Sequence, residues 1–189
     1  LAQKIATLTG GTLSIMTDGA NSSGAWLAGF IPHRRAAGAS ANMSGLNAYD
    51  MLAKPLKNYL LLNVEPDLDC ANSADAIAAI KQADSVIAFS TYLNPILAAK
   101  ADIIFPIAAF TETSGTFVNA RGEWQSFAGV ANAFENARPA WKVLRVLANF
   151  LHIDGFNYES SEEARDELKA LLANIDQAPG ALKVTTLSA

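Results

Sequence analysis

The sequence contains very little cysteine and histidine. Its 189 residues include one cysteine, Cys70, and two histidines, His33 and His152. One thiol excludes an internal disulfide, and an iron–sulfur cluster held by this chain alone would need about four thiolates. The two histidines lie far apart in the sequence, so a structural zinc site is nearly excluded as well. We therefore expect no redox centre and no metal ligand within these residues.

Positive charge and long apolar runs are also scarce. The chain carries 14 basic and 18 acidic residues, for a net charge of −4, whereas a general nucleic-acid binder usually has a basic surface. No apolar run reaches the roughly 18–20 residues that a membrane span needs. With 51% hydrophobic residues, the chain can bury a core. We expect a folded domain that binds no nucleic acid and does not insert directly into a membrane.

Three apolar runs, joined by two helical patterns, predict a parallel sheet. The first two runs are continuous, which is typical of strands buried on both faces. Short strand–helix–strand connections favour right-handed crossovers. The expected fold class is therefore α/β, with a Rossmann-like parallel sheet flanked by helices. The strands are expected at 58–64, 85–90 and 102–107, and the helices at 74–83 and 96–101.

The first of these helices has a clear expected start and an expected apolar side. Ser73 precedes it and is a natural N-cap. The apolar positions of the helix are then Ala74, Ile77, Ala78 and Ile80.

The remaining segments suggest shorter elements around the sheet. Gly10-Gly11 should end a first helix. A hairpin is indicated by TFVN and EWQSF, which flank a glycine turn, and Pro139 suits the start of a helix that should be largely buried. Ser160 or Ser161 should cap a last helix. The other expectations are a helix over 1–9, a strand over 12–16, a helix over 25–30, an irregular stretch over 31–45, helical turns over 46–53 and a loosely held tail over 176–189.

The loop 18–24 is one candidate ligand site. It follows an expected strand and precedes an expected helix, where backbone amides can bind an anion. Its spacing matches neither the Walker motif nor the dinucleotide-binding glycine motif. A tight loop selected for its turn geometry is the alternative. Cys70, with no activating neighbour, is expected to be an inert thiol.

Charged residues around the hairpin form a second candidate site. Glu112, Arg121 and Glu123 should lie near its turn. On their residue types alone, they are as well explained by an exposed ion-pair network, which contributes little to stability.

Residues 101–127 resemble the signature of the molybdopterin oxidoreductase superfamily. Members typically carry an A-D-V-V-L-P strand, an acidic residue, then G-T-F-x-N and E-G-R-x-Q, and the helix that follows here resembles the A-R-P-x-W helix of the family. The matching residues are Ala101, Asp102, Pro106, Glu112, Gly115, Thr116, Phe117, Asn119, Gly122 and Gln125.

Further segments resemble the C-terminal half of one family within it, the large iron–sulfur subunit (the G subunit) of bacterial NADH-quinone oxidoreductase, respiratory complex I. They are GANSSGAWLAGFIPHR, LNAYDMLAKPLKNYLLLNVEPDLDC and GFNYESSEEARDEL. In that family, the N-terminal part holds iron–sulfur clusters, and the molybdopterin-type half is a structural remnant without molybdenum cofactor. Leu1, inside the apolar stretch LAQKIATL, suggests a piece of a longer protein.

The resemblance implies a domain organisation, partners and a location. It implies a molybdopterin-oxidoreductase-like α/β domain over 1–152, partial in extent, followed by a C-terminal helix and tail over 153–189. Its partners would be the N-terminal part of the same subunit and other peripheral-arm subunits. Its place would be the cytoplasmic side of the bacterial inner membrane, as a peripheral part of the complex.

The resemblance also implies a non-catalytic domain with a vestigial pocket. No cofactor is expected there, and iron–sulfur clusters are expected only in the part upstream. One departure supports this interpretation, because Arg121-Gly122-Glu123 exchanges the two charges of the usual E-G-R and places a carboxylate where a phosphate would be repelled. The vestigial pocket candidates are Asn21, Ser22, Ser23, Glu112, Gly115, Thr116, Asn119, Arg121 and Gln125.

Two alternatives stay open. The chain could belong to a true molybdopterin enzyme, such as a formate dehydrogenase, in which loop 18–24 and residues 112–125 help to hold a pterin guanine dinucleotide. It could also be a free-standing nucleotide-binding module, which would require phosphate affinity from loop 18–24.

Overall fold

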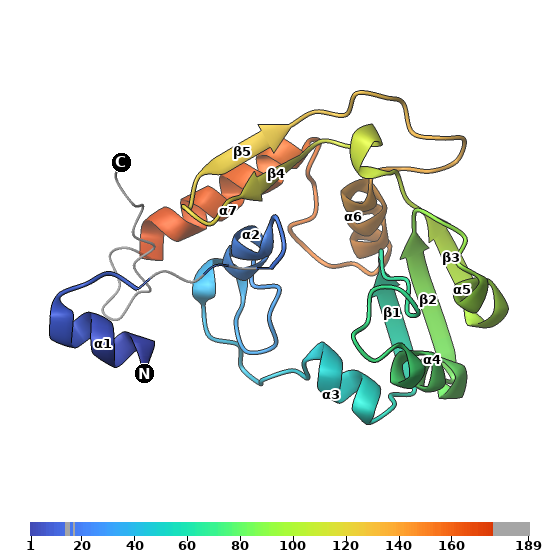
Figure 1. The fold of residues 1–189 in the computed structure, drawn as a ribbon. Helices are drawn as coiled ribbons and strands as arrows, with labels where there is room; N and C mark the ends of the chain where they lie inside the picture. The colour runs from blue at the N-terminus through green and yellow to red at the C-terminus, as the bar shows by residue number, and fades with distance from the viewer. Residues whose placement is uncertain (14–15, 17, 176–189) are drawn as a thin grey trace.

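A computed structural model describes residues 1–13, 16 and 18–175. The chain forms two groups of elements (Figure 1). A parallel sheet with its helices occupies one end, and an antiparallel hairpin with the last helix lies at the other. Part of the strand expected over 12–16 and the whole tail over 176–189 lie outside the described residues.

The parallel sheet confirms the predicted fold class. Its strands are β1 (Asn58–Leu62), β2 (Ser85–Ser90) and β3 (Ile103–Pro106). They pair in parallel in the order β1-β2-β3, with β2 in the centre. Helices α4 (Ser73–Gln82) and α5 (Pro95–Lys100) connect them. The chain is thus a mixed α/β protein with a Rossmann-like sheet.

The burial of the strands differs from the expectation. β2 is buried as predicted, with Val86, Ala88 and Phe89 fully inaccessible. β1 was expected to be buried on both faces, and this is wrong: Tyr59 is its one buried side chain, and Leu60 is 56% exposed. β1 lies at the edge of the sheet, so one side of it has no neighbouring strand.

Helix α4 corrects two details of the sequence-based expectation. Its N-cap is Asn72 rather than Ser73, because the Asn72 side chain accepts a hydrogen bond from the Asp75 N–H. The helix buries Ala76, Ala79 and Ile80, whereas Ala74 and Ala78 are not buried. Alanine occupies positions on both sides of this helix, so the apolar pattern alone could not identify the buried side.

The core under the sheet is small and well defined. Tyr59, Ala79, Ile80, Ala83 and Val86 form one buried cluster between the strands and α4. On the other face of the sheet, the rings of Phe89 and Phe105 stack with centroids 5.0 Å apart. Side chains alternate between the faces along each strand, so the two groups belong to opposite faces.

The N-terminal elements are short helices. α1 (Ala2–Thr9) ends at Gly10, whose φ of 69° gives the left-handed cap expected there. α2 (Ser22–Leu27) begins three residues before the expected start at residue 25. A 3-10 turn, η1 (Ala36–Gly38), lies inside the stretch expected to be irregular, and α3 (Ala48–Ala53) provides the turns expected before Pro55.

The hairpin is present as predicted. β4 (Gly115–Val118) and β5 (Trp124–Phe127) pair antiparallel, and a 3-10 turn, η2 (Phe110–Glu112), precedes them. Helix α7 (Ser161–Ile175) lies beside the hairpin (Figure 1) and contacts β4 and η1. Ser160 accepts a hydrogen bond from the Glu163 N–H at its start, as the sequence indicated. The domain boundary at 152/153 stays a prediction.

Helix α6 (Ala140–Phe150) begins directly after Pro139, as expected, but it is not largely buried. Ala148 is its one buried residue, and Phe150 is 78% exposed. Apolar residues around a helix predict burial only if other elements surround it, and among the described residues one side of α6 has no partner. Across the part of the chain that the structure describes, no helix has the length and hydropathy needed to cross a membrane.

Candidate functional site

Loop 18–24 and the hairpin meet, although they are far apart in the sequence. The Asn21 Oδ1 atom accepts a hydrogen bond of 2.8 Å from the Val118 N–H in β4. A side chain at Gly24 would overlap the Asn21 side chain, so glycine is required for this close approach. The structure therefore brings the two sequence-predicted candidate regions together at one place.

Two side chains of this loop, Asn21 and Ser22, are already engaged within the protein. Ser22 Oγ accepts a hydrogen bond of 3.1 Å from the Gly19 N–H. Asn21, Ser22 and Ser23 are all half-buried, and Ser22 and Ser23 form the first turn of α2. The loop closes on itself and on β4, which agrees with the interpretation of a tight loop selected for its turn geometry.

The turn of the hairpin is held by Asn119. Its Oδ1 atom accepts hydrogen bonds from the N–H groups of Arg121 (2.9 Å) and Glu123 (3.0 Å), and its Nδ2 atom donates to Glu123 over 2.8 Å. Arg121 and Glu123 form an ion pair of 3.5 Å with both side chains about half exposed. The exchanged charges thus neutralise each other on the surface.

The other candidates of the hairpin serve its packing. Thr116 Oγ1 and Ser126 Oγ are hydrogen-bonded across the strands at 2.9 Å. A Cβ at Gly115 would approach the Phe127 ring to 2.7 Å. Glu112 closes η2 by accepting a hydrogen bond from the Ala109 N–H, while Gln125 is exposed on β5. These contacts are local and explain most of the motif residues as structural.

The structure also reveals a polar cluster that the sequence analysis missed. It lies at the carboxyl edge of the parallel sheet, where α/β proteins bind ligands. Asn94 is 3% exposed, and its Nδ2 atom donates to Asp67 (2.7 Å) and Glu65 (3.4 Å). Nearby, Thr91 donates to Asn63 over 3.0 Å. Polar residues directly after β1 and β2 were the signal that could have identified it.

This edge does not fit a phosphate group. Asn94 Oδ1 already accepts the N–H groups of Ile96 and Leu97, the donors at the start of α5. The side chains bonded around it are carboxylates, which would repel a diphosphate. The residues that the sheet edge and the hairpin present therefore do not fit the anionic dinucleotide part of a pterin cofactor.

The Cys70 thiol is a poor nucleophile. Burial, with a smaller contribution from neighbouring Asp69, raises the pKa of the Cys70 thiol, which disfavours the nucleophilic thiolate. This agrees with the expected inert thiol. Among the residues with a described position, no group of three or more His, Cys, Asp and Glu side chains could hold a metal ion.

The fold, the signature hairpin and its position after β3 define a class of protein. The model of the molybdopterin oxidoreductase family matches residues 2–150. The chain belongs to this family.

Individual relatives narrow the similarity. The chain is 31% identical to the G subunit of NADH-quinone oxidoreductase from Rickettsia prowazekii over 107 residues, 55% of this chain and 16% of that protein. It is 35% identical to the mitochondrial NADH-ubiquinone oxidoreductase 78 kDa subunit of Candida albicans over 69 residues, 36% of this chain and 10% of that protein. It is 25% identical to nitrate reductase of Shewanella frigidimarina over 141 residues, which are 72% of this chain and 15% of that protein. The alignments thus cover only 10–16% of the length of these relatives.

Proposed function

We propose that this chain is a non-catalytic structural domain of the large iron–sulfur subunit of an NADH-quinone oxidoreductase. It braces the part of that subunit that holds iron–sulfur clusters, on the cytoplasmic side of the bacterial inner membrane and in contact with other peripheral subunits. Electrons pass from NADH to quinone through the whole complex, and none enter these residues.

One observation carries the proposal. Polar groups of the candidate regions are bonded within the protein: Asn21 to Val118, Asn119 to Arg121 and Glu123, and Asn94 to Asp67. In a binding site such groups would be free to bond the ligand, because the exchange of an internal hydrogen bond for one to a ligand gains little free energy. The single cysteine and the similarity to the NADH-quinone oxidoreductase relative support the same function.

Metal and pterin analysis of the complete polypeptide, purified from its native source, tests this function. We expect iron and sulfide, no stoichiometric molybdenum and no pterin. Stoichiometric molybdenum that is lost when Asn94 or Asn119 is replaced would overturn the proposal, since it would place the cofactor against these residues. Circular dichroism of the variants controls for loss of fold.

A second candidate function has one observation in its favour. The alignment with nitrate reductase covers 72% of the chain, more than the 55% covered by the NADH-quinone oxidoreductase relative. The chain would then be part of a molybdopterin enzyme. The same measurement separates the two functions, because only this one requires bound molybdenum and reduction or oxidation of a small substrate by the purified protein.

A further inference from the structure

One face of the parallel sheet is only partly covered. Strand pairing aligns Leu60 with Ile87 and Ile87 with Ile103, and side-chain alternation puts all three on the face of Phe89 and Phe105. Leu60 and Ile103 are 56% and 47% exposed. Parallel sheets normally have both faces covered by helices, so within the described part of the chain this face lacks part of its helical layer.

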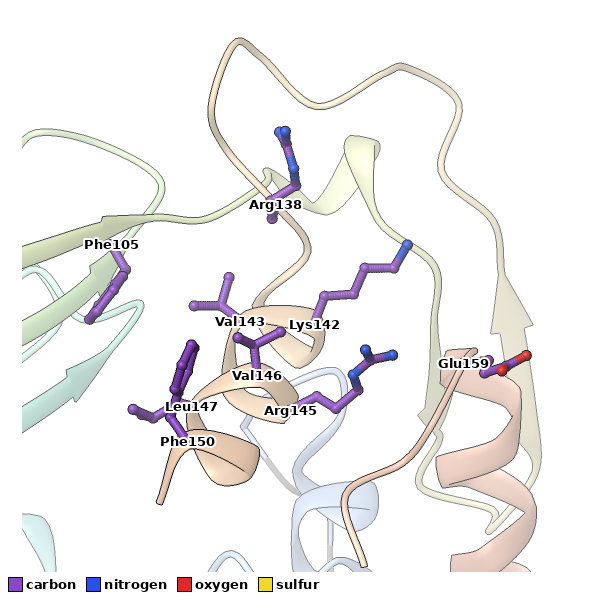
Figure 2. A pocket seen from close by; sticks show the side chains of 9 residues that line it. All are labelled: Phe105, Arg138, Lys142, Val143, Arg145, Val146, Leu147, Phe150 and Glu159. Atoms are coloured by element: carbon purple, nitrogen blue, oxygen red, sulfur yellow. The ribbon is translucent and has the colours of Figure 1, made fainter. Parts of the chain in front are cut away.

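Helix α6 forms one wall of a groove beside this face. A bridge between Ile107 and Arg138, together with a hydrogen bond from the Ala108 N–H to the Arg138 carbonyl, attaches the start of the helix to the end of β3. The groove has a volume of about 890 Å³. Figure 2 shows Phe105 from the sheet facing Val143, Leu147 and Phe150 of α6. The floor is therefore apolar.

Basic side chains border the same groove. Arg138, Lys142 and Arg145 line it, with Glu159 as the one acidic lining residue (Figure 2). Lys142 and Arg145 are three residues apart, so they share a side of α6. The side of α6 that faces Phe105 carries Val143, Leu147 and Phe150, and Val146 lies between these residues and Lys142 (Figure 2). The groove thus combines an apolar stripe with a parallel basic stripe.

These basic groups have no acidic partner within the described part of the chain. The Arg138 guanidinium donates to the carbonyls of Glu135 and Ala137, and that of Arg145 to the carbonyl of Tyr158. The Lys142 ammonium lies 5.3 Å from the centroid of the adjacent Trp141 ring. The ion pairs found among the described residues involve other side chains. In a chain of net charge −4, three unpaired cations around an apolar floor indicate an acidic occupant.

We propose that this groove binds an amphipathic helix of a partner polypeptide, apolar along one side and carrying carboxylates beside that side. A helix fits because α6, with 11 residues, presents roughly 16 Å of parallel apolar and basic stripes at helical spacing. Its apolar side would cover the open sheet face, and its carboxylates would pair with Lys142 and the neighbouring arginines. The proposal holds whichever of the two functions above is correct.

Binding of two designed peptides to the full chain tests the proposal. Both are labelled helices of about 15 residues with leucine at i, i+3, i+4 and i+7. One carries glutamate beside the leucines, and the other carries lysine at the same positions. Fluorescence anisotropy should show binding of the glutamate peptide that weakens as salt increases, with at least roughly tenfold weaker binding of the lysine peptide. Equal binding of both, or no binding of the glutamate peptide, overturns the proposal.

Matched variants locate the binding site. Lys142→Glu should weaken binding of the glutamate peptide about tenfold, whereas Lys81→Glu on α4 should not change it. Phe150→Ser should weaken binding, whereas Phe134→Ser, at a residue of similar exposure, should not. All four positions are exposed, so the folded state should persist, which an unchanged circular dichroism spectrum verifies. Equal effects of a variant and its control would overturn the assignment to this groove.

Two other occupants give distinct results. If a second copy of the chain fills the groove, sedimentation will show concentration-dependent dimers that Phe150→Ser abolishes and that the glutamate peptide does not displace. If an anionic membrane surface is the partner, vesicles of phosphatidylglycerol will bind the chain in a Lys142-dependent way while the glutamate peptide does not bind. Either result would replace the proposed helix.

Discussion

Asn21 and Val118 are joined by a hydrogen bond of 2.8 Å across 97 residues of sequence. The bond ties the loop before α2 to the signature hairpin. Val118 is 2% exposed, so its N–H depends on this one side chain for a partner. The relationship makes Asn21 a structural residue and leads to the first prediction.

Asn21→Ala should lower the free energy of unfolding by about 1–3 kcal/mol, because it leaves the Val118 N–H buried without an acceptor. Urea unfolding followed by circular dichroism measures the change. Asn132→Ala, at an exposed asparagine, is the control and should change stability by less than about 0.5 kcal/mol. An equal effect of both substitutions would show that the bond contributes nothing.

Tyr59→Phe should also destabilise the fold. The Tyr59 hydroxyl donates to the Met51 carbonyl (2.8 Å) and accepts from the Leu56 N–H (2.9 Å), while its ring is part of the core. Loss of the hydroxyl leaves both backbone groups without this partner, at a cost of about 1–3 kcal/mol. Thermal or urea unfolding measures it. Tyr49→Phe, at a residue 75% exposed, should be close to neutral, and a comparable loss there would contradict the prediction.

Asp102 should make stability depend on pH in the acid range. A hydrogen bond of 2.7 Å from the Val86 N–H, supported by the Ser85 side chain, lowers the pKa of this carboxyl below its usual value of 3.8. Since the pKa is lower in the folded state, the stabilisation is complete above the usual value. It is lost as the pH falls through the lowered one.

Asp102→Asn should therefore reduce stability at neutral pH and flatten the decrease between about pH 5 and pH 2. Urea unfolding at a series of pH values measures both effects. Asp154→Asn, at an exposed carboxylate, is the control. A wild-type and an Asp102→Asn curve that run parallel through the acid range would refute the assignment.

Two glycines with positive φ should respond differently to alanine. Gly10 and Gly29 have φ values of 69° and 78°, so alanine is strained at both by roughly 1 kcal/mol. At Gly10 nothing lies within 4 Å of the added Cβ, whereas at Gly29 it would overlap the backbone of Arg35 and Ala36. Gly29→Ala should therefore cost clearly more than Gly10→Ala in free energy of unfolding, as urea unfolding of the two variants measures. Equal costs would mean that the backbone near Arg35 yields easily.

The sequence predicted the elements better than their surroundings. The three strands, the hairpin and the start of α6 follow from apolar runs, glycine and proline, which are local signals. The exposure of Leu60 and Phe150 could not be predicted in this way, because burial depends on which other elements are present. An apolar run has the same appearance whether or not a neighbour covers it.

The candidate site was predicted in part. The motif positions located the hairpin, and the exchanged charges of Arg121 and Glu123 indicated an internal pair, which is present. The bond between Asn21 and Val118 joins residues that share no sequence motif, so it could be identified only from the three-dimensional structure. Asn94 was not predicted, because its contact with Asp67 depends on the parallel pairing of β1 and β2.

The distance along the chain between bonded residues also sets an order of folding. Contacts within the parallel sheet close short loops, since Val86 and Asp102 are 16 residues apart and Asp67 and Asn94 are 27. The Asn21–Val118 bond closes a loop of 97 residues, which costs more chain entropy. The amides of the sheet should therefore gain protection from hydrogen exchange before the Val118 N–H does, and a nascent chain can form its α/β core before loop 18–24 packs on β4.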